Sequence, residues 1–176
     1  MASCQELDEL VQKIPGAQTL LYNTWGRRSG DERNPGLYPD FLTHQWRLNQ
    51  GYEKYLEATT TPERPTFVSP VGRVFEAIYM DIKGQSKDPL DQDSLFYQLY
   101  GPDGSHPSVA GSYLAALTMY ASMLGEDPRE VKWIPEEVDP DMAKQIQRAV
   151  AWTFLETIAM GMTYPWQAEL IDEDLP

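Results

Sequence analysis

The sequence predicts an α/β fold with few parallel strands and flanking helices. Two short runs, residues 19–25 (TLLYNTW) and 66–72 (TFVSPVG), are apolar and rich in strand-forming residues, as expected of buried strands. Helix-length amphipathic segments separate and follow them, and this alternation indicates a parallel sheet covered by helices. Two strands are too few for a stable open sheet, which usually has about five. The predicted fold is therefore partial.

The first helix is expected to run from residue 3 to about residue 14. Ser3 followed by Glu6 fits a capping box, in which the two side chains satisfy backbone N–H groups at the start of a helix. Apolar residues then recur at helical spacing: Leu7, Leu10, Val11 and Ile14. Pro15 and Gly16 end this segment, and the first strand candidate follows.

Loops and helices alternate in the middle of the chain. Residues 26–40 combine glycine and proline with many charges, which predicts a long loop. Asp40 is placed to cap a helix that runs to about Ala58. After the second strand candidate, residues 74–82 predict a brief helix, and the polar residues 83–94 predict an exposed loop.

Two further helices are expected in the second half of the chain. Pro107 is suited to the first position of a helix that ends at Gly125. Asp139 and Pro140 mark the start of the next helix. Its apolar residues recur in steps of four: Met142, Ile146, Val150, Phe154 and Ile158. Residues from Gly161 onward show no clear periodicity.

The composition excludes several classes of function. A net charge of −13 opposes nucleic acid and anionic membrane surfaces, because both carry phosphates. The longest apolar stretches are far shorter than the roughly 20 residues of a membrane-spanning helix, so no transmembrane segment is predicted. With Cys4 as the single cysteine and only two histidines, a disulfide within the chain is excluded and a zinc site is disfavoured. No cofactor or metal is expected.

The run LYGPDGSHPSVAGSYLAAL, residues 99–117, carries the candidate catalytic residues. Asp103 and His106 lie three residues apart before a predicted helix, and Gly104 allows a tight turn between them. A neutral imidazole can take a proton from a serine hydroxyl and return it to the leaving group, while a carboxylate fixes its tautomer. By itself this spacing is a weak signal, because such a carboxylate is often a helix cap and a lone histidine is often structural.

The wider run resembles the last motif of the SGNH/GDSL hydrolases, where Asp-x-x-His, a proline and a helix supply two members of a catalytic triad. The segment DGSHPSVAGSYLAAL is similar to a bacterial-type branch of that superfamily, and YNTW, QGY and SPVG upstream extend the resemblance over residues 1–125. It implies a three-layer α/β/α, flavodoxin-like fold and the hydrolysis of carboxylic esters. It also implies that His106 is the general base and that Asp103 orients it.

The nucleophile block of that family, Gly-Asp-Ser or Gly-Asn-Ser after the first strand, is not recognisable in this chain. The capping box explains Ser3, and residues 29–31 (SGD) reverse the expected order and indicate a turn. Ser105 and Ser108 flank the histidine, but helix capping explains them better than nucleophilic attack. By the resemblance, the chain begins before the family's fourth strand. The absent strands would leave a sheet edge and apolar helix faces exposed.

We therefore expect residues 1–125 to be the C-terminal part of an SGNH-hydrolase-like domain and residues 126–176 to be a helical extension packed on it. The expected function is the C-terminal half of a serine esterase, inactive alone, that acts on a small-molecule ester once completed. The alternative is a non-catalytic binding or oligomerisation module, with a carbohydrate or protein partner or a second copy at the sheet edge. Candidate stacking residues for that module, equally suited to a core, are Trp25, Trp46, Trp133, Trp152 and Trp166.

Two weaker hypotheses concern other side chains. The loop arginines Arg27, Arg28 and Arg33 are candidate contacts for an anionic substrate, although a solvated loop is the default interpretation. Metal binding by Asp103 and His106 together with Asp91 or Asp93 has too few ligands at fixed spacing. The sequence leaves the localisation and the ester substrate open.

Overall fold

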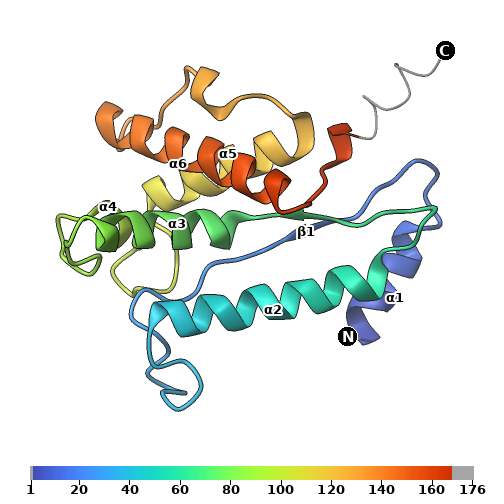
Figure 1. Ribbon diagram of the computed structural model, residues 1–176, viewed down its shortest axis with the longest axis horizontal. Helices are drawn as coiled ribbons and strands as arrows, with labels where there is room; N and C mark the ends of the chain where they lie inside the picture. Colours follow the sequence, from blue (N-terminus) through green and yellow to red (C-terminus); the bar gives the residue numbers. More distant parts are fainter. Residues whose placement is uncertain (1, 168–176) are drawn as a thin grey trace.

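The computed structural model describes residues 2–167 of the chain, whose path is shown in Figure 1. Its elements are α1 (Ala2–Val11), β1 (Leu20–Tyr22), α2 (Phe41–Thr59), β2 (Phe67–Ser69), α3 (Val71–Gly84), α4 (Leu95–Gln98), α5 (Val109–Leu124), the 3₁₀ turn η1 (Pro128–Glu130) and α6 (Pro140–Ala159). The protein is mixed α/β and mostly helical, with a two-stranded parallel sheet in the described part. This confirms the predicted class at the coarse level of a partial α/β fold.

The strands β1 and β2 are of the predicted type but shorter than predicted. They pair in parallel over three residues, with Leu20 opposite Phe67 and Tyr22 opposite Ser69. The second strand ends before Pro70, which has no N–H group to continue the ladder, and α3 begins directly after it. The expected helix at residues 74–82 is therefore longer, because it takes in residues assigned to the strand.

One edge of this sheet is open at β1. Thr19 accepts a hydrogen bond from the amide of Phe67 at 2.9 Å, and the amide of Asn23 donates to Ser69 at 3.1 Å. Alternate residues of a strand face the same neighbour, so the backbone groups of Leu20 and Tyr22 face away from β2. Within residues 2–167 no third strand pairs with them.

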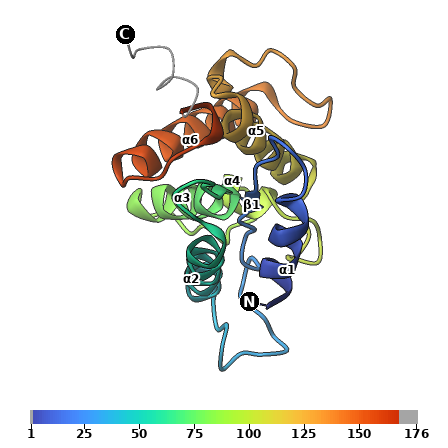
Figure 2. The same cartoon turned by 90° about the vertical axis from the view of Figure 1, so that its right-hand side faces the viewer.

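Helices lie on both faces of the strands. Figure 1 shows α2 on one side and α5 with α6 on the other, and the perpendicular view in Figure 2 agrees. The core draws on α2 to α6, and its most buried residues include Phe41, Val71, Val74, Phe75, Phe96, Leu99, Leu114, Ile146 and Val150. The helix α6 thus shares one core with the segments before residue 125. Residues 168–176 of the predicted extension lie outside the described residues.

Several helix ends coincide with the predicted capping residues. The carboxylate of Asp40 accepts from the amide of Thr43 at 2.7 Å, and that of Asp139 accepts from Met142 at 3.1 Å. Gly125 ends α5 in the left-handed conformation, with φ of 70°. These predicted boundaries are confirmed. No helix among residues 2–167 has the length and apolar content that a membrane span requires.

The start of α5 differs from its prediction. The helix begins at Val109, and Ser108 rather than Pro107 stands at its boundary, with its hydroxyl accepting from Gly111 at 3.2 Å. Pro107 instead lies opposite Tyr100 in an isolated bridge. The short helix α4 has no counterpart in the sequence prediction, since four residues are too few to show a helical period.

The helix α1 also departs from expectation. It already includes Ala2, so Ser3 lies inside it, and the predicted capping box is wrong. The buried carboxylate of Asp8 pairs with Arg64, which turns a polar side of α1 towards the protein. Of the four apolar residues that define its predicted period, Val11 is half-buried, and the other three are exposed: Leu7 (65 %), Leu10 (56 %) and Ile14 beyond its end (60 %).

Candidate active site

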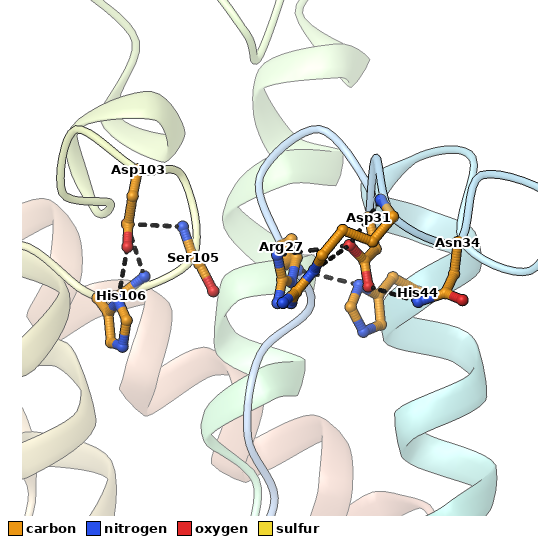
Figure 3. Close-up of polar contacts among 8 residues, drawn as sticks. Arg27, Asp31, Asn34, His44, Asp103, Ser105 and His106 are labelled. Atoms are coloured by element: carbon orange, nitrogen blue, oxygen red, sulfur yellow. Dashed lines mark hydrogen bonds and ion pairs between the residues drawn. The ribbon is translucent and has the colours of Figure 1, made fainter.

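Asp103 and His106 form an ion-paired turn before α5 (Figure 3). One carboxylate oxygen of Asp103 accepts from Nδ1 of His106 at 2.6 Å. The other accepts from the backbone amides of Ser105 and His106, each at 3.0 Å. Gly104 between them has φ of 63°, a conformation that glycine adopts at little cost. The predicted pair is thus brought into direct contact by one turn of backbone.

The carboxylate of Asp103 keeps its charge in this turn. The hydrogen bond from His106, followed by those from the two amides, holds the pKa of Asp103 well below its usual range. A charged carboxylate only accepts hydrogen bonds, so Nδ1 of His106 is the donor. In the neutral imidazole, Nε2 is then the acceptor. The side chain of His106 is 84 % exposed, so this nitrogen is accessible from solvent.

The turn is fastened to the loop that follows β1. The indole N–H of Trp25 donates to the carbonyl of Ser105 at 3.0 Å, and the amide of Arg28 donates to the carbonyl of Gly104 at 2.9 Å. Trp25 itself is stacked on Phe75 of α3, with ring centroids 5.1 Å apart. The exposed pair therefore rests on a backbone that is anchored in the core.

The two ends of the turn are held by contacts with α4 and α5. The amide of Gly101 donates to the carbonyl of His106 at 2.9 Å, which closes the turn on itself. The hydroxyl of Ser108 donates to Gln98 at 2.6 Å while it accepts from α5. Tyr100, which is buried, donates a hydrogen bond from its hydroxyl to the carbonyl of Gly26 at 2.7 Å, the third hydrogen bond between this region and the β1–α2 loop.

The serines that the sequence analysis considered do not engage the imidazole. Ser108 is occupied as a helix cap, which confirms that interpretation. Residues 29–31 form a turn around Gly30, whose φ of 86° confirms the prediction for SGD. Among residues 2–167, no side-chain hydroxyl forms a hydrogen bond with His106. The described residues therefore place an imidazole and a carboxylate in direct contact, and no side-chain hydroxyl among them is hydrogen-bonded to the imidazole.

A buried polar network surrounds the end of β1. Asn23, at the end of that strand, donates from Nδ2 to Asn49 at 3.3 Å, and Gln45 donates to the same acceptor at 2.9 Å. Asn49 in turn donates to Glu76 of α3 at 3.1 Å. A Cβ on Gly72 would lie 2.2 Å from the Gln45 amide, so only glycine fits there. The network joins β1, α2 and α3, and it leaves Oδ1 of Asn23 without a partner in the described chain.

The second histidine, His44, has a structural environment. Its Nδ1 accepts from the amide of Arg27 at 3.2 Å (Figure 3). Its ring stacks on that of Tyr38, with the centroids 4.3 Å apart. Burial lowers the pKa of His44, which favours the neutral ring that this hydrogen bond requires. Nearby, Asp31 pairs with Arg27 and Arg33, both at 3.4 Å. This cluster orders the long loop between β1 and α2.

The described residues offer no ready metal centre. In residues 2–167, no group of three or more His, Cys, Asp or Glu side chains is arranged to hold an ion. Asp91 accepts from the amide of Asp93 at 3.0 Å within their own loop, and Asp103 pairs with His106. The geometry of the turn is thus that of an acid–base pair.

Sequence reasoning did not assign the residues that hold this pair to that role, although it named Trp25 as a stacking candidate and Arg28 as a candidate contact for an anionic substrate. Trp25 and Arg28 lie far from Asp103 in the chain, and Tyr100, three residues before it, acts through a hydrogen bond from its hydroxyl to the distant Gly26, so no spacing could reveal these contacts. The one available signal was that Trp25 and Tyr100 lie within the motifs YNTW and LYGPDGSH.

Comparison with known proteins gives a likeness of fold. No protein-family model and no curated protein matches the sequence. A solved structure that resembles it is the crystal structure of a DUF4886 family protein from Bacteroides uniformis ATCC 8492, with a TM-score of 0.67 and 18 % sequence identity. The likeness covers 88 % of this chain and 56 % of that one. This chain therefore spans little more than half of a protein with the same arrangement of elements.

Proposed function

We propose that this chain carries the base and the orienting acid of a serine-esterase site, and that a segment outside it supplies the nucleophile. The observation that supports this function best is the 2.6 Å hydrogen bond that holds Nδ1 of His106 on Asp103 and leaves Nε2 accessible. The resemblance of the DGSHPS run to the SGNH/GDSL motif assigns the same roles. The reaction class is hydrolysis of a carboxylic ester.

In this mechanism His106 moves the proton and Asp103 keeps it in position. Nε2 of His106 accepts the proton of the serine hydroxyl as the oxygen attacks the ester carbonyl, and later returns it to the departing alcohol. The charged carboxylate of Asp103 fixes the ring tautomer and stabilises the imidazolium between these steps. Because hydrogen bonds from Trp25 and Arg28 anchor the turn, the imidazole of His106 loses little conformational entropy when it is positioned for each turnover.

The partial sheet supports a nucleophile from elsewhere. An SGNH-type domain is a three-layer α/β/α sandwich, and the described chain has helices on both faces of only two strands. The structurally similar DUF4886 family protein extends well beyond the matched part. In our proposal, a segment that carries the serine and the oxyanion-hole donors completes the sheet at the open edge of β1.

The decisive experiment labels the activated serine in the natural source. The protein is tagged in its native host, purified together with whatever polypeptide carries or accompanies it, and treated with a fluorophosphonate, which phosphonylates activated serines. We expect one labelled serine outside residues 1–176. His106→Ala should abolish the labelling, because the serine would lose its base, and Asp103→Asn should lower kcat on the order of 10⁴-fold. His44→Ala is the matched control and should keep the labelling.

Two outcomes contradict the proposal. If the isolated 176-residue chain hydrolyses p-nitrophenyl acetate and loses this activity in His106→Ala, the nucleophile lies on this chain. If the native preparation contains no serine whose labelling depends on His106, the turn has no esterase role.

The second candidate function, a binding or oligomerisation module, is favoured by the open edge of β1 and by the exposed apolar residues Leu7 and Leu10 of α1. It predicts a native complex that forms normally and shows no labelled serine. A complex whose assembly tolerates His106→Ala, and which hydrolyses no ester, would support it over the esterase.

A further inference from the structure

The three arginines of the β1–α2 loop have different partners. Arg27 and Arg33 both pair with Asp31. Arg28 forms no ion pair with the described residues 2–167, although the chain carries a net charge of −13. Its side chain also donates no hydrogen bond to any of these residues. Of the three, Arg28 is thus the one whose charge is left for another group.

Arg28 is held rigidly beside the catalytic turn. Its guanidinium lies over the ring of Tyr97, 3.7 Å from the centroid, and the ring of Tyr100 is 6.0 Å away. Its amide donates to Gly104, and a Cβ built on Gly104 would lie 3.4 Å from its Nη2. Gly104 lies between Asp103 and the two residues, Ser105 and His106, whose amides donate to the Asp103 carboxylate. The guanidinium therefore lies against the turn that carries the general base.

The neighbouring acid does not satisfy this cation. The carboxylate of Asp103 is engaged by His106 and two backbone amides. The ring of Tyr97 covers one face of the Arg28 guanidinium. The N–H groups of a guanidinium lie in its plane, where two of them can donate parallel hydrogen bonds to a carboxylate. The single positive charge of Arg28 matches a carboxylate better than it matches a dianionic phosphate, because binding a phosphate usually requires several hydrogen-bond donors or cations.

We propose that Arg28, stacked on Tyr97, is a specificity-determining subsite for a carboxylate on the substrate, next to the ester that His106 acts on. The inference rests on the proposed function for its reaction and names the substrate class: esters that bear a carboxylate, such as half-esters of dicarboxylic acids. Arg28 binds the carboxylate of the substrate. The hydrogen bond from the Arg28 amide to the carbonyl of Gly104 keeps the guanidinium at a fixed separation from the imidazole of His106.

The binding test uses the isolated chain and requires no hydrolysis. The Nε–H resonances of the arginines in ¹⁵N-labelled protein are followed during titration with monomethyl succinate, and with dimethyl succinate as the neutral control. We expect a saturable shift of the Arg28 resonance with the half-ester alone, absent in Arg28→Gln and preserved in Arg33→Gln. No shift of Arg28, or an equal shift of Arg33, would overturn the proposal.

The kinetic test uses the complete native enzyme. The ratio of kcat/KM for mono-p-nitrophenyl succinate to that for neutral p-nitrophenyl butyrate should fall about tenfold or more in Arg28→Gln, through KM, because a charge-assisted bond is lost. In Arg33→Gln, which removes an exposed charge from the same loop, the ratio should stay within about twofold. An unchanged ratio in Arg28→Gln overturns the subsite. Hydrolysis of neither ester would instead refute the esterase, with the binding test still deciding on Arg28.

Discussion

At the scale of single residues, the conformation of one turn decides where the imidazole of His106 points. Asp103 accepts three hydrogen bonds from a stretch of four residues, and these bonds keep its pKa low enough for the carboxylate to remain charged through the neutral and mildly acidic range. Gly104 makes this compact arrangement possible because its φ is positive. The exposed imidazole of His106 is therefore fixed by backbone geometry more than by burial.

The backbone of Gly104 gives the first prediction. Gly104→Ala should destabilise the fold by about 1–2 kcal/mol, since a Cβ is disfavoured at positive φ while its nearest neighbours, at 3.4 Å or more, leave room. Gly101→Ala, in the same turn without positive φ and with its nearest atom at 3.6 Å, is the control and should change stability by less than about 0.5 kcal/mol. Urea unfolding compares them, and equal effects would refute a role for the left-handed conformation.

At the scale of elements, close approaches of backbone fix how the helices meet. Gly111 in the first turn of α5 lies against the segment after α4, and a Cβ there would come within 2.1 Å of the carbonyl oxygen of Leu99. The same segment leads at Tyr100 and Gly101 into the turn that carries Asp103 and His106. The packing of α5 on the backbone of Leu99 therefore fixes the position of the turn with Asp103 and His106 relative to the core.

This contact predicts opposite effects of alanine at two helical glycines. Gly111→Ala should destabilise the protein by about 1–3 kcal/mol, because α5 must shift away from Leu99. Gly51→Ala, inside α2 with nothing within 4 Å of its Cβ, should stabilise it by up to about 1 kcal/mol through helix propensity. Thermal and urea unfolding measure both changes. A stabilised Gly111→Ala would show that the close approach is not a constraint.

The attachment of α1 should depend on acid pH. Burial raises the pKa of Asp8, but hydrogen bonds from Arg64, Gln12 and Thr19 outweigh it, and the pKa is lowered overall. A carboxylate with a lowered folded pKa stabilises the folded state above its unfolded pKa of about 3.9 and loses this contribution as the pH falls further. We expect the stability of wild type to fall more steeply than that of Asp8→Asn between about pH 5 and 2. Urea unfolding at several pH values tests this, and parallel curves would contradict it.

At the scale of the whole molecule, the described chain exposes surfaces that sheets and helices usually cover. β1 leaves the backbone groups of Leu20 and Tyr22 unpaired on its outer side within the described residues, and Leu7 and Leu10 of α1 are exposed. An open edge readily pairs with another strand. In the proposed esterase, that other strand belongs to the segment that completes the sheet. When this segment is absent, the β1 strands of two copies of this chain can pair with each other in antiparallel orientation about a two-fold axis.

We therefore expect the isolated chain to self-associate through β1. Leu20→Pro removes the outward N–H and leaves the bonds to β2 intact, so it should weaken the dimer strongly. Leu20→Ala, which keeps the N–H, is the control for loss of the side chain and should still dimerise. Sedimentation velocity over a range of concentrations distinguishes them, with circular dichroism as the check on folding. Dimerisation of Leu20→Pro at wild-type affinity would exclude this edge as the interface.

The sequence by itself determined the features that depend on neighbouring residues. Capping at Asp40 and Asp139 and the left-handed stop at Gly125 follow from local backbone chemistry, and so does the contact of Asp103 with His106 three residues later. The type and order of the two strands also followed from their apolar, strand-forming composition.

Only the tertiary structure decided the rest, because those features depend on contacts between distant segments. Asp8 of α1 is buried in an ion pair with Arg64, 56 residues away, while Leu7 and Leu10 of the same helix are exposed, although its periodicity alone predicts that they are buried. Trp25 donates a hydrogen bond to Ser105 in the turn between Asp103 and His106, 80 residues away in the chain. Of three similar arginines, two pair with Asp31, and Arg28 instead stacks on Tyr97 beside the turn that carries His106, an arrangement set by distances that no spacing in the sequence encodes.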